Sequence, residues 1–156
     1  MAGVPVSGAQ PAPAFDMDAF NRQVIAEFRA NGGHVGGRFA GLPMLLLTTT
    51  GAKSGVERTT PLVCRPEGGT LVIIASKAGA PEHPAWYHNI VANPEVTVEY
   101  GTETFRARAR IAKGDERERL YAAQAALLPA FDEYRQRTTR EIPVVVLEPI
   151  MSPAVD

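Results

Sequence analysis

The chain has 156 residues, of which 45% are hydrophobic, a length and composition that suit one compact domain with an apolar core. Its 16 lysines and arginines nearly balance its 17 aspartates and glutamates, so no overall positive field would recruit nucleic acid or an anionic membrane. No apolar run reaches the roughly 18 residues of a membrane-spanning helix. The single cysteine, Cys64, excludes an intramolecular disulfide and favours a cytoplasmic protein with a buried thiol.

The chain divides into an arm, one domain and a tail. Residues 1–14 contain three prolines and lack the charged and apolar regions of a signal peptide, which predicts a mobile N-terminal arm. Residues 15–150 are expected to form a single domain that begins with a helix. Residues 151–156 are expected to form a short C-terminal tail.

The first predicted element is an amphipathic helix over residues 15–30. Phe20, Val24 and Phe28 recur every four residues, and glycines follow Asn31, where the helix should end. The polar side of this helix mixes acidic and basic residues and lacks a strongly cationic face. We therefore expect no stable membrane association, with peripheral attachment as the less favoured alternative.

Short strands follow in the middle of the chain. Apolar and β-branched runs separated by glycine-containing turns predict strands over 44–50, 58–65 and 70–76, and their succession predicts an antiparallel meander. Alternation of apolar and polar residues predicts a further hairpin, with strands over 96–100 and 105–111.

Helices flank these strands. Proline and glycine positions predict helices over 84–92, 115–128 and 131–139 and a last strand over 144–147. The elements do not alternate as strand and helix, and no G-x-G-x-x-G follows a strand, which disfavours a doubly wound nucleotide-binding sheet. The pattern predicts an α+β domain built on a small, mainly antiparallel barrel.

The loop TTTGAKSGVERTTP, residues 48–61, is the first candidate binding segment. It lacks the spacing of a P-loop, and Pro61 stands where a phosphate-binding helix would begin. Glycines can turn backbone N–H groups toward a ligand, while Lys53 and Arg58 supply charge and Ser54 and Thr59 supply hydroxyl groups. Recognition of a phosphate or carboxylate is one interpretation, and a solvated hairpin turn is the other.

The segment ASKAGAPEHPAWYHN, residues 75–89, is the second candidate. Small residues at Ala78, Gly79 and Ala80 would let a flat ring approach the backbone closely, between Lys77 and Trp86. A groove shared by the two segments would suit a flat ring with a phosphorylated tail. Trp86 could equally anchor the core beneath the turn.

Two other groups of residues have plainer interpretations. The three histidines show no metal-ligand spacing, so we expect no metal site. Arg106, Arg108 and Arg110 lie on one face of a predicted strand, where acidic neighbours favour ion pairs over nucleic-acid binding.

Three ordered segments carry a resemblance to a known family. The runs LLLTTTGAKSGVERTTPL, ASKAGAPEHPAWYHNIVANPEV and EYRQRTTREIPVVVLEP resemble the deazaflavin-dependent nitroreductases of actinobacteria, and the similarity extends over residues 44–149. Those proteins are split β-barrels related to FMN-binding split barrels, and they use coenzyme F420. The resemblance implies an α+β split barrel with flanking helices, and a homodimer is a further expectation.

The resemblance also implies a cofactor site. One loop would grip the anionic cofactor tail, and it comprises Lys53, Ser54, Gly55, Arg58, Thr59, Thr60 and Pro61. The turn of Ser76, Lys77, Ala78, Gly79 and Ala80 would lie along the deazaflavin ring, and Trp86 and Asn89 would make contacts on the phosphate side. Phe131 and Tyr134 would line the substrate pocket, although the family often has a second tyrosine where this chain has Phe131.

The implied reaction is hydride transfer from reduced F420 to a small electrophilic acceptor such as a quinone, nitroaromatic or activated enone. Tyr134 is the candidate catalytic residue, because its hydroxyl could donate the matching proton or hydrogen-bond the acceptor. Two alternatives stay open: a split-barrel oxidoreductase that uses FMN, and an F420-binding carrier without catalysis.

Overall fold

A computed structural model describes residues 16–150, so the predicted arm at 1–14 and tail at 151–156 lie outside the described residues. Its centre is a sheet of seven strands in the order β2-β1-β5-β6-β7-β4-β3, in which every neighbouring pair is antiparallel. The strands are β1 (Met44–Thr50), β2 (Glu57–Val63), β3 (Arg65–Glu67), β4 (Thr70–Ile74), β5 (Glu95–Tyr100), β6 (Glu103–Ile111) and β7 (Val144–Pro149).

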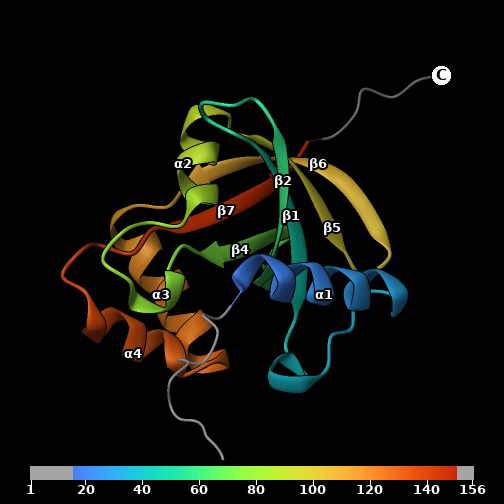
Figure 1. The fold of residues 1–156 in the computed structure, drawn as a ribbon. Helices are drawn as coiled ribbons and strands as arrows, with labels where there is room; N and C mark the ends of the chain where they lie inside the picture. The colour runs from blue at the N-terminus through green and yellow to red at the C-terminus, as the bar shows by residue number, and fades with distance from the viewer. Residues whose placement is uncertain (1–15, 151–156) are drawn as a thin grey trace, which may run out of the picture.

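Helices surround the curled sheet (Figure 1). The α-helices are α1 (Met17–Ala30), α2 (Ala85–Ala92), α3 (Gly114–Leu127) and α4 (Ala130–Arg137), and the short 3-10 helices are η2 (Gly37–Phe39) and η3 (Lys77–Gly79). In the described part of the chain none of these helices has the length and apolar content needed to cross a bilayer. The predicted α+β class with a mainly antiparallel barrel is confirmed.

The order of the strands corrects the predicted meander. The β1–β2 hairpin forms as expected, but β4 pairs with β7 and not with β2, so β2 and β3 occupy opposite edges of the sheet. The chain therefore crosses from one edge to the other between Val63 and Arg65, where Cys64 separates the two strands. The hairpin of β5 and β6 is confirmed, with the pair Tyr100 and Glu103 at its end.

The core explains why several strands are apolar without interruption. Leu45 and Leu47 of β1 point into the barrel, whereas Met44 and Leu46 pack against α1 on the outside. The strands β4 and β7 repeat this alternation, with one face inside the barrel and the other against α3 and α4. Both faces of these strands are buried, and such strands are expected to be continuously hydrophobic. Cys64 also lies inside the barrel, and its burial raises the pKa of the thiol to about 12.

The first helix is fixed to the sheet at its C-terminal end. The guanidinium of Arg29 donates to both carboxylate oxygens of Glu99 on β5, at 3.0 and 2.8 Å, and Glu27 accepts from the N–H of Gly36 at 2.7 Å. Val24 and Phe28 are buried against β1, as the four-residue spacing predicted. The N-terminal half of α1 is thereby held over the edge of β2.

The arginines of β6 form ion pairs, which confirms their plainer interpretation. Arg106 and Arg108 both lie near Glu95 on the neighbouring strand, with N···O distances of 3.6 and 3.3 Å. Arg110 contacts Glu116 at 2.7 Å and Glu148 at 3.2 Å. These contacts join β6 to its neighbours and to α3.

Candidate functional site

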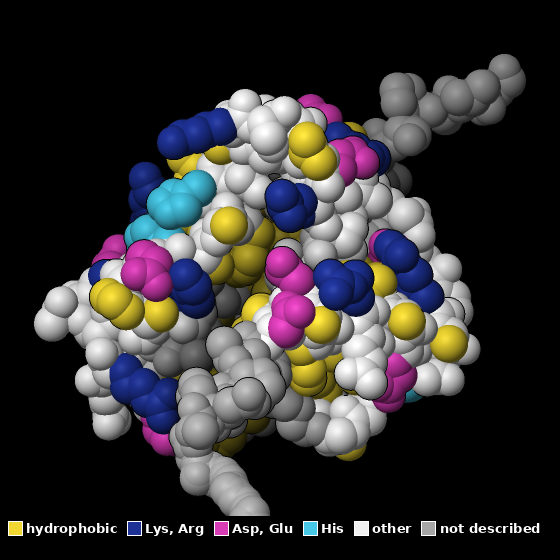
Figure 2. Space-filling view, in the orientation of Figure 1, with side chains coloured by type: hydrophobic (Ala, Val, Ile, Leu, Met, Phe, Trp, Pro, Cys, Tyr) yellow, Lys and Arg dark blue, Asp and Glu magenta, His cyan; other side chains and the backbone are white. Residues whose placement is uncertain are grey.

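A groove of about 880 Å³ runs along the free edge of β2. Figure 2 shows it as a hollow in which hydrophobic side chains are visible, with charged side chains of both signs around its rim. Most of its lining comes from α1, β2, the turn after β4, the start of α2, and α4, with further residues from η2, β1 and the end of β4. The curl of the sheet creates the groove, because it brings β2 opposite the end of β4.

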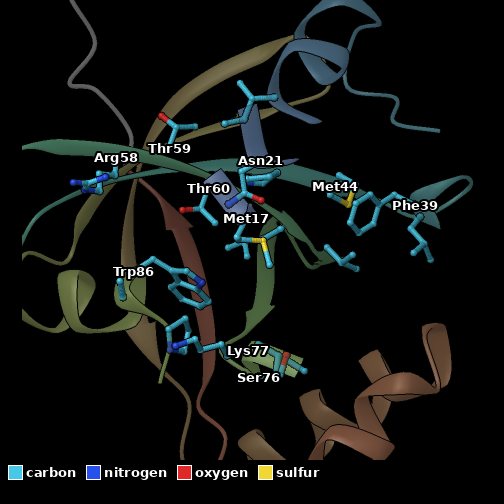
Figure 3. Close-up of a pocket in the computed structure, with 18 of the residues that line it drawn as sticks. Met17, Asn21, Phe39, Met44, Arg58, Thr59, Thr60, Ser76, Lys77 and Trp86 are labelled. Carbon is cyan, nitrogen blue, oxygen red and sulfur yellow. The ribbon is translucent and has the colours of Figure 1, made fainter. Parts of the chain in front are cut away.

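Strand β2 provides one wall of the groove. Arg58, Thr59, Thr60 and Pro61 all line it, as the first candidate segment predicted. In Figure 3, Thr60 points toward Trp86, whereas Thr59 points to the other side of the strand. The hydroxyl of Thr59 is 2.8 Å from that of Thr48 and shares a hydrogen bond with it, so this group is already partly engaged.

Arg58, like Arg22 on the same groove, is not paired with a carboxylate among the described residues. It is exposed at the groove, and within residues 16–150 its guanidinium has neither a hydrogen bond nor an ion pair. Other arginines of the described chain, among them Arg29, Arg110 and Arg135, are paired with carboxylates. An unpaired guanidinium beside an apolar groove is available to a carboxylate or phosphate of a ligand.

The turn after β4 provides the opposite wall. Ser76 and Lys77 line the groove, and Lys77 has a left-handed backbone with φ of 46°, which is uncommon for a residue with a side chain. The ammonium of Lys77 donates to Glu82 at 3.1 Å, so its charge is partly balanced. Gly79 and Ala80, predicted in the same turn, do not line the groove. Gly79 packs instead against α4.

Trp86 is both a core residue and part of the groove wall. It belongs to the core cluster inside the barrel and is only 6% exposed, yet it also lines the groove at the start of α2. Pro84 is the N-cap residue, immediately before the first residue of this helix. The indole therefore forms part of the groove wall that is rigidly held by the core, a suitable contact for a flat ring.

The fourth helix brings both predicted substrate residues to the groove. Phe131 is buried and Tyr134 is half-buried, and their rings meet edge to face with centroids 5.6 Å apart. The backbone carbonyl of Phe131 accepts from the hydroxyl of Tyr121 at 2.5 Å, which fixes the start of α4 to α3. Burial raises the pKa of Tyr121 to about 12, so this donor stays protonated.

The tip of the β1–β2 loop lies outside the groove lining. Lys53, Ser54 and Gly55 are exposed, and the hydroxyl of Ser54 accepts from the N–H of Val56 at 3.1 Å. Gly55 has φ of 70°, a conformation that favours glycine in this tight turn. Like Arg58, Lys53 has no ion-pair partner among the described residues.

Asn89 differs from the expectation of a direct ligand contact. Its side chain is buried, donates to the hydroxyl of Thr49 at 3.0 Å and accepts from the N–H of Ala52 at 3.0 Å. The amide thus ties the loop that carries Lys53 to α2. This structural role was missed because the partners are distant in the sequence.

The first helix supplies groove residues that the sequence did not predict. Met17, Asp18, Asn21, Arg22 and Ile25 line the groove on the face of α1 next to its core stripe. Figure 3 shows Met17 and Asn21 opposite Trp86 and the turn of Ser76. The helical period had identified only the buried stripe, and nothing local indicated that the adjacent face would line a groove.

We also searched the described residues for side chains that could bind a metal ion together. Histidine, cysteine and acidic side chains within residues 16–150 form no cluster of three that could hold a metal ion.

Comparisons with known proteins agree with the predicted resemblance. The model of the F420H(2)-dependent quinone reductase family matches residues 20–149. Over 128 residues the chain is 39% identical to an F420H(2)-dependent quinone reductase of Mycobacterium tuberculosis, covering 78% of this chain and 85% of the relative.

Two solved structures are similar to this chain in both fold and sequence. An F420-H2-dependent reductase superposes with a TM-score of 0.64 at 43% identity, covering 68% of this chain and 94% of that one. A protein described as a domain-swapped dimer superposes with a TM-score of 0.65 at 38% identity, covering 84% and 98%. With a family model that spans the split barrel and relatives of this similarity, the chain belongs to the F420H(2)-dependent quinone reductase family.

Proposed function

We propose that this protein reduces quinones with hydride from reduced F420, which it binds in the groove along β2. Family membership supports F420 as the cofactor over FMN, and the names of the relatives support a quinone as the acceptor. The observation that carries the proposal is Arg58, a guanidinium that lines the groove and has no ion-pair partner among the described residues.

The groove fits a ring with an anionic tail. Trp86 and the turn at Ser76 and Lys77 offer a flat, partly apolar wall for the ring. Arg58 lines the facing wall, on β2, and Lys53 lies further along the same hairpin. A tail leaving the groove past Arg58 would therefore continue toward Lys53, where both cations can form charge-assisted hydrogen bonds with it.

When bound, reduced F420 supplies the hydride, so the protein needs no nucleophile of its own. The chain's contribution is to hold the ring and the acceptor together and to exclude water. We assign the exclusion of water to the apolar side chains of α1 and α4 that line the groove, Met17, Ile25 and Phe131. Tyr134 is the only tyrosine of the described residues that lines this groove, and we assign its hydroxyl to hydrogen bonding with a quinone oxygen.

The direct test is turnover. Purified protein is mixed with reduced F420 and a short-chain benzoquinone, and the return of oxidised F420 absorbance is followed against a reaction without protein. We expect quinone-dependent oxidation, together with tighter binding of F420 than of FMN by quenching of Trp86 fluorescence. Preferential binding of FMN would overturn the cofactor assignment, and binding of F420 without turnover would favour the carrier alternative.

The remaining proposals concern binding partners, location and oligomeric state. We propose a small-molecule acceptor as the physiological partner, with neither nucleic acid nor a membrane as a stable partner, and a cytoplasmic location. A homodimer is supported by the domain-swapped neighbour. Light scattering coupled to size-exclusion chromatography tests it.

A further inference from the structure

Arg140 lies outside the groove, but its guanidinium is bound to the turn that forms one groove wall. Its Nε donates to the carbonyl oxygen of Ala80 at 2.9 Å, and its Nη2 donates to that of Ser76 at 2.7 Å. Its Nη1 donates to the carbonyl oxygen of Ala75 at 3.2 Å and lies 2.9 Å from Nδ1 of His83. We define these contacts as the Arg140 clasp.

The geometry of the clasp suits a guanidinium and no other side chain. Its planar fork holds fixed donor directions, and here all three nitrogens are engaged with acceptors along residues 75–83. Since arginine can only donate, Nδ1 of His83 must accept, which places the imidazole proton on Nε2. The clasp thereby closes the turn at both of its ends.

A second contact joins the same turn to α4. Gly79 has φ of 80°, and a Cβ placed on it would lie 2.8 Å from Cβ of Arg137 and 3.0 Å from the carbonyl oxygen of Tyr134. The backbone of the turn therefore touches the backbone of the helix that carries Tyr134. Arg140 lies three residues after the end of α4 at Arg137, so the clasp and this contact hold the turn and the helix together.

We propose that Arg140 is a positioning residue, which sets the width of the groove by fixing the turn of Ser76 and Lys77 against the helix of Phe131 and Tyr134. Arg140 does not line the groove, so we assign it no contact with F420 or with the quinone. It keeps the left-handed backbone of Lys77 in place and holds the cofactor side and the acceptor side of the groove in register. This inference rests on the proposed function for its effect on turnover, but its effect on the turn is independent of any ligand.

The first measurement needs no cofactor. Hydrogen exchange reports on the N–H groups of Gly79 and Ala80, which donate to the carbonyl oxygens of Ser76 and Lys77 at 2.9 and 3.0 Å. In Arg140→Lys, which keeps the charge and the stem, we expect these amides to exchange at least tenfold faster while amides of β1 and β5 are unchanged. Arg65→Ala is the matched control, because Arg65 is also partly buried but its guanidinium binds Glu67 on its own strand and makes no contact with the turn.

The second measurement is F420 binding and steady-state kinetics on the same variants. We expect Arg140→Ala to weaken F420 binding about tenfold and to lower kcat at saturating cofactor, and added guanidinium ion to restore part of both. Arg65→Ala should lose thermal stability without losing affinity. Unchanged exchange in the turn of Arg140→Lys, or equal losses of affinity in the Arg140 and Arg65 variants, would overturn the inference. Failure of the wild-type protein to bind F420 would instead overturn the proposed function, and the exchange data would still decide the role of Arg140.

Discussion

The side-chain amide of Asn89 donates to the hydroxyl of Thr49, so α2 is fixed to the end of β1 by a buried hydrogen bond of 3.0 Å. The same amide accepts from the N–H of Ala52, at the entrance to the loop of Lys53. Asn89, which was expected to contact a ligand, thus supports the loop that carries Lys53, the residue that we propose to bind the cofactor tail. A supporting role for Asn89 predicts that its loss affects stability as well as cofactor affinity.

Asn89→Ala should lower both stability and cofactor affinity. Removing the amide leaves the buried hydroxyl of Thr49 without this partner and also removes the part-buried bond to the N–H of Ala52, which costs about 1–3 kcal/mol in the free energy of unfolding measured with urea. The freed loop should also bind F420 more weakly. Thr49→Val is the control, because it removes only the bond to the strand and leaves the Ala52 contact. Equal affinity of Asn89→Ala and wild type would contradict the supporting role.

Arg58→Ala should weaken F420 binding about tenfold, or about 1.4 kcal/mol. The loss should be larger in 0.01 M than in 0.1 M salt, because the Debye length falls from about 30 Å to about 10 Å between these conditions. Calorimetric titration at both salt concentrations measures the effect. Arg119→Ala makes the same change in net charge on α3, where Arg119 is paired with Glu67, and should bind F420 like the wild type. A similar loss in both variants would show a general charge effect rather than a contact.

Tyr134→Phe should lower kcat/KM for a benzoquinone about tenfold while leaving F420 affinity unchanged. The ring keeps its edge-to-face contact with Phe131, so the variant removes only the hydroxyl that we assign to the acceptor. Steady-state kinetics at saturating reduced F420 measure the change. Tyr100→Phe is the control, since Tyr100 lies on β5 away from this groove. An unchanged rate in Tyr134→Phe would remove Tyr134 from the reaction.

Acid should weaken the fold through His83. Burial, with smaller contributions from Arg140 and His88, holds the pKa of His83 below its ordinary value of 6.5. The stability that the neutral ring contributes is therefore complete above pH 6.5 and is lost as the pH falls through the lower folded-state pKa. Other polar and charged groups around the ring are Tyr87, His88, Lys113, Arg117, Arg140 and Glu141, with Glu82 adjacent in sequence.

His83→Asn tests this titration. The amide oxygen of asparagine can accept from Arg140 as Nδ1 does, but it does not titrate. The melting temperature of the wild type should fall more steeply than that of His83→Asn between pH 7 and pH 5. Parallel curves for the two proteins would show that the pH dependence comes from another group.

Local features of the sequence predicted the elements well. Strand β1 has the predicted bounds, and α1 ends where Asn31 and two glycines indicated, because glycine and proline constrain the backbone locally. Pairing across the sheet was not predictable in this way. The strands β2 and β4 are near in sequence but on different sides of the sheet order, since pairing depends on which faces the whole core buries.

The residues of the candidate site also fall into two groups, those predictable from local motifs and those that depend on contacts between distant parts of the chain. Residues of β2, the turn and α4 were found through their motifs, and they do meet at one groove. Arg140 and the groove face of α1 were missed. Arg140 binds carbonyl oxygens roughly 60 positions earlier in the chain, and a hydrogen bond to a backbone carbonyl leaves no trace in the sequence of the acceptor.

The groove lies between β2, at one edge of the sheet, and the turn after β4, near the other edge. The two walls are close in sequence, but β2 and β4 do not pair, and the strands β1, β5, β6 and β7 lie between them in the sheet. The walls therefore face each other only when the entire barrel has formed, and we expect affinity for a ligand only then. Binding then acts on the global folding equilibrium: at a free ligand concentration about one hundred times Kd, it adds about 2.7 kcal/mol to the stability of the folded state. Binding of the cofactor therefore contributes to the free energy of unfolding of such a protein, and the cofactor concentration in the cell would affect the fraction of the protein that is folded.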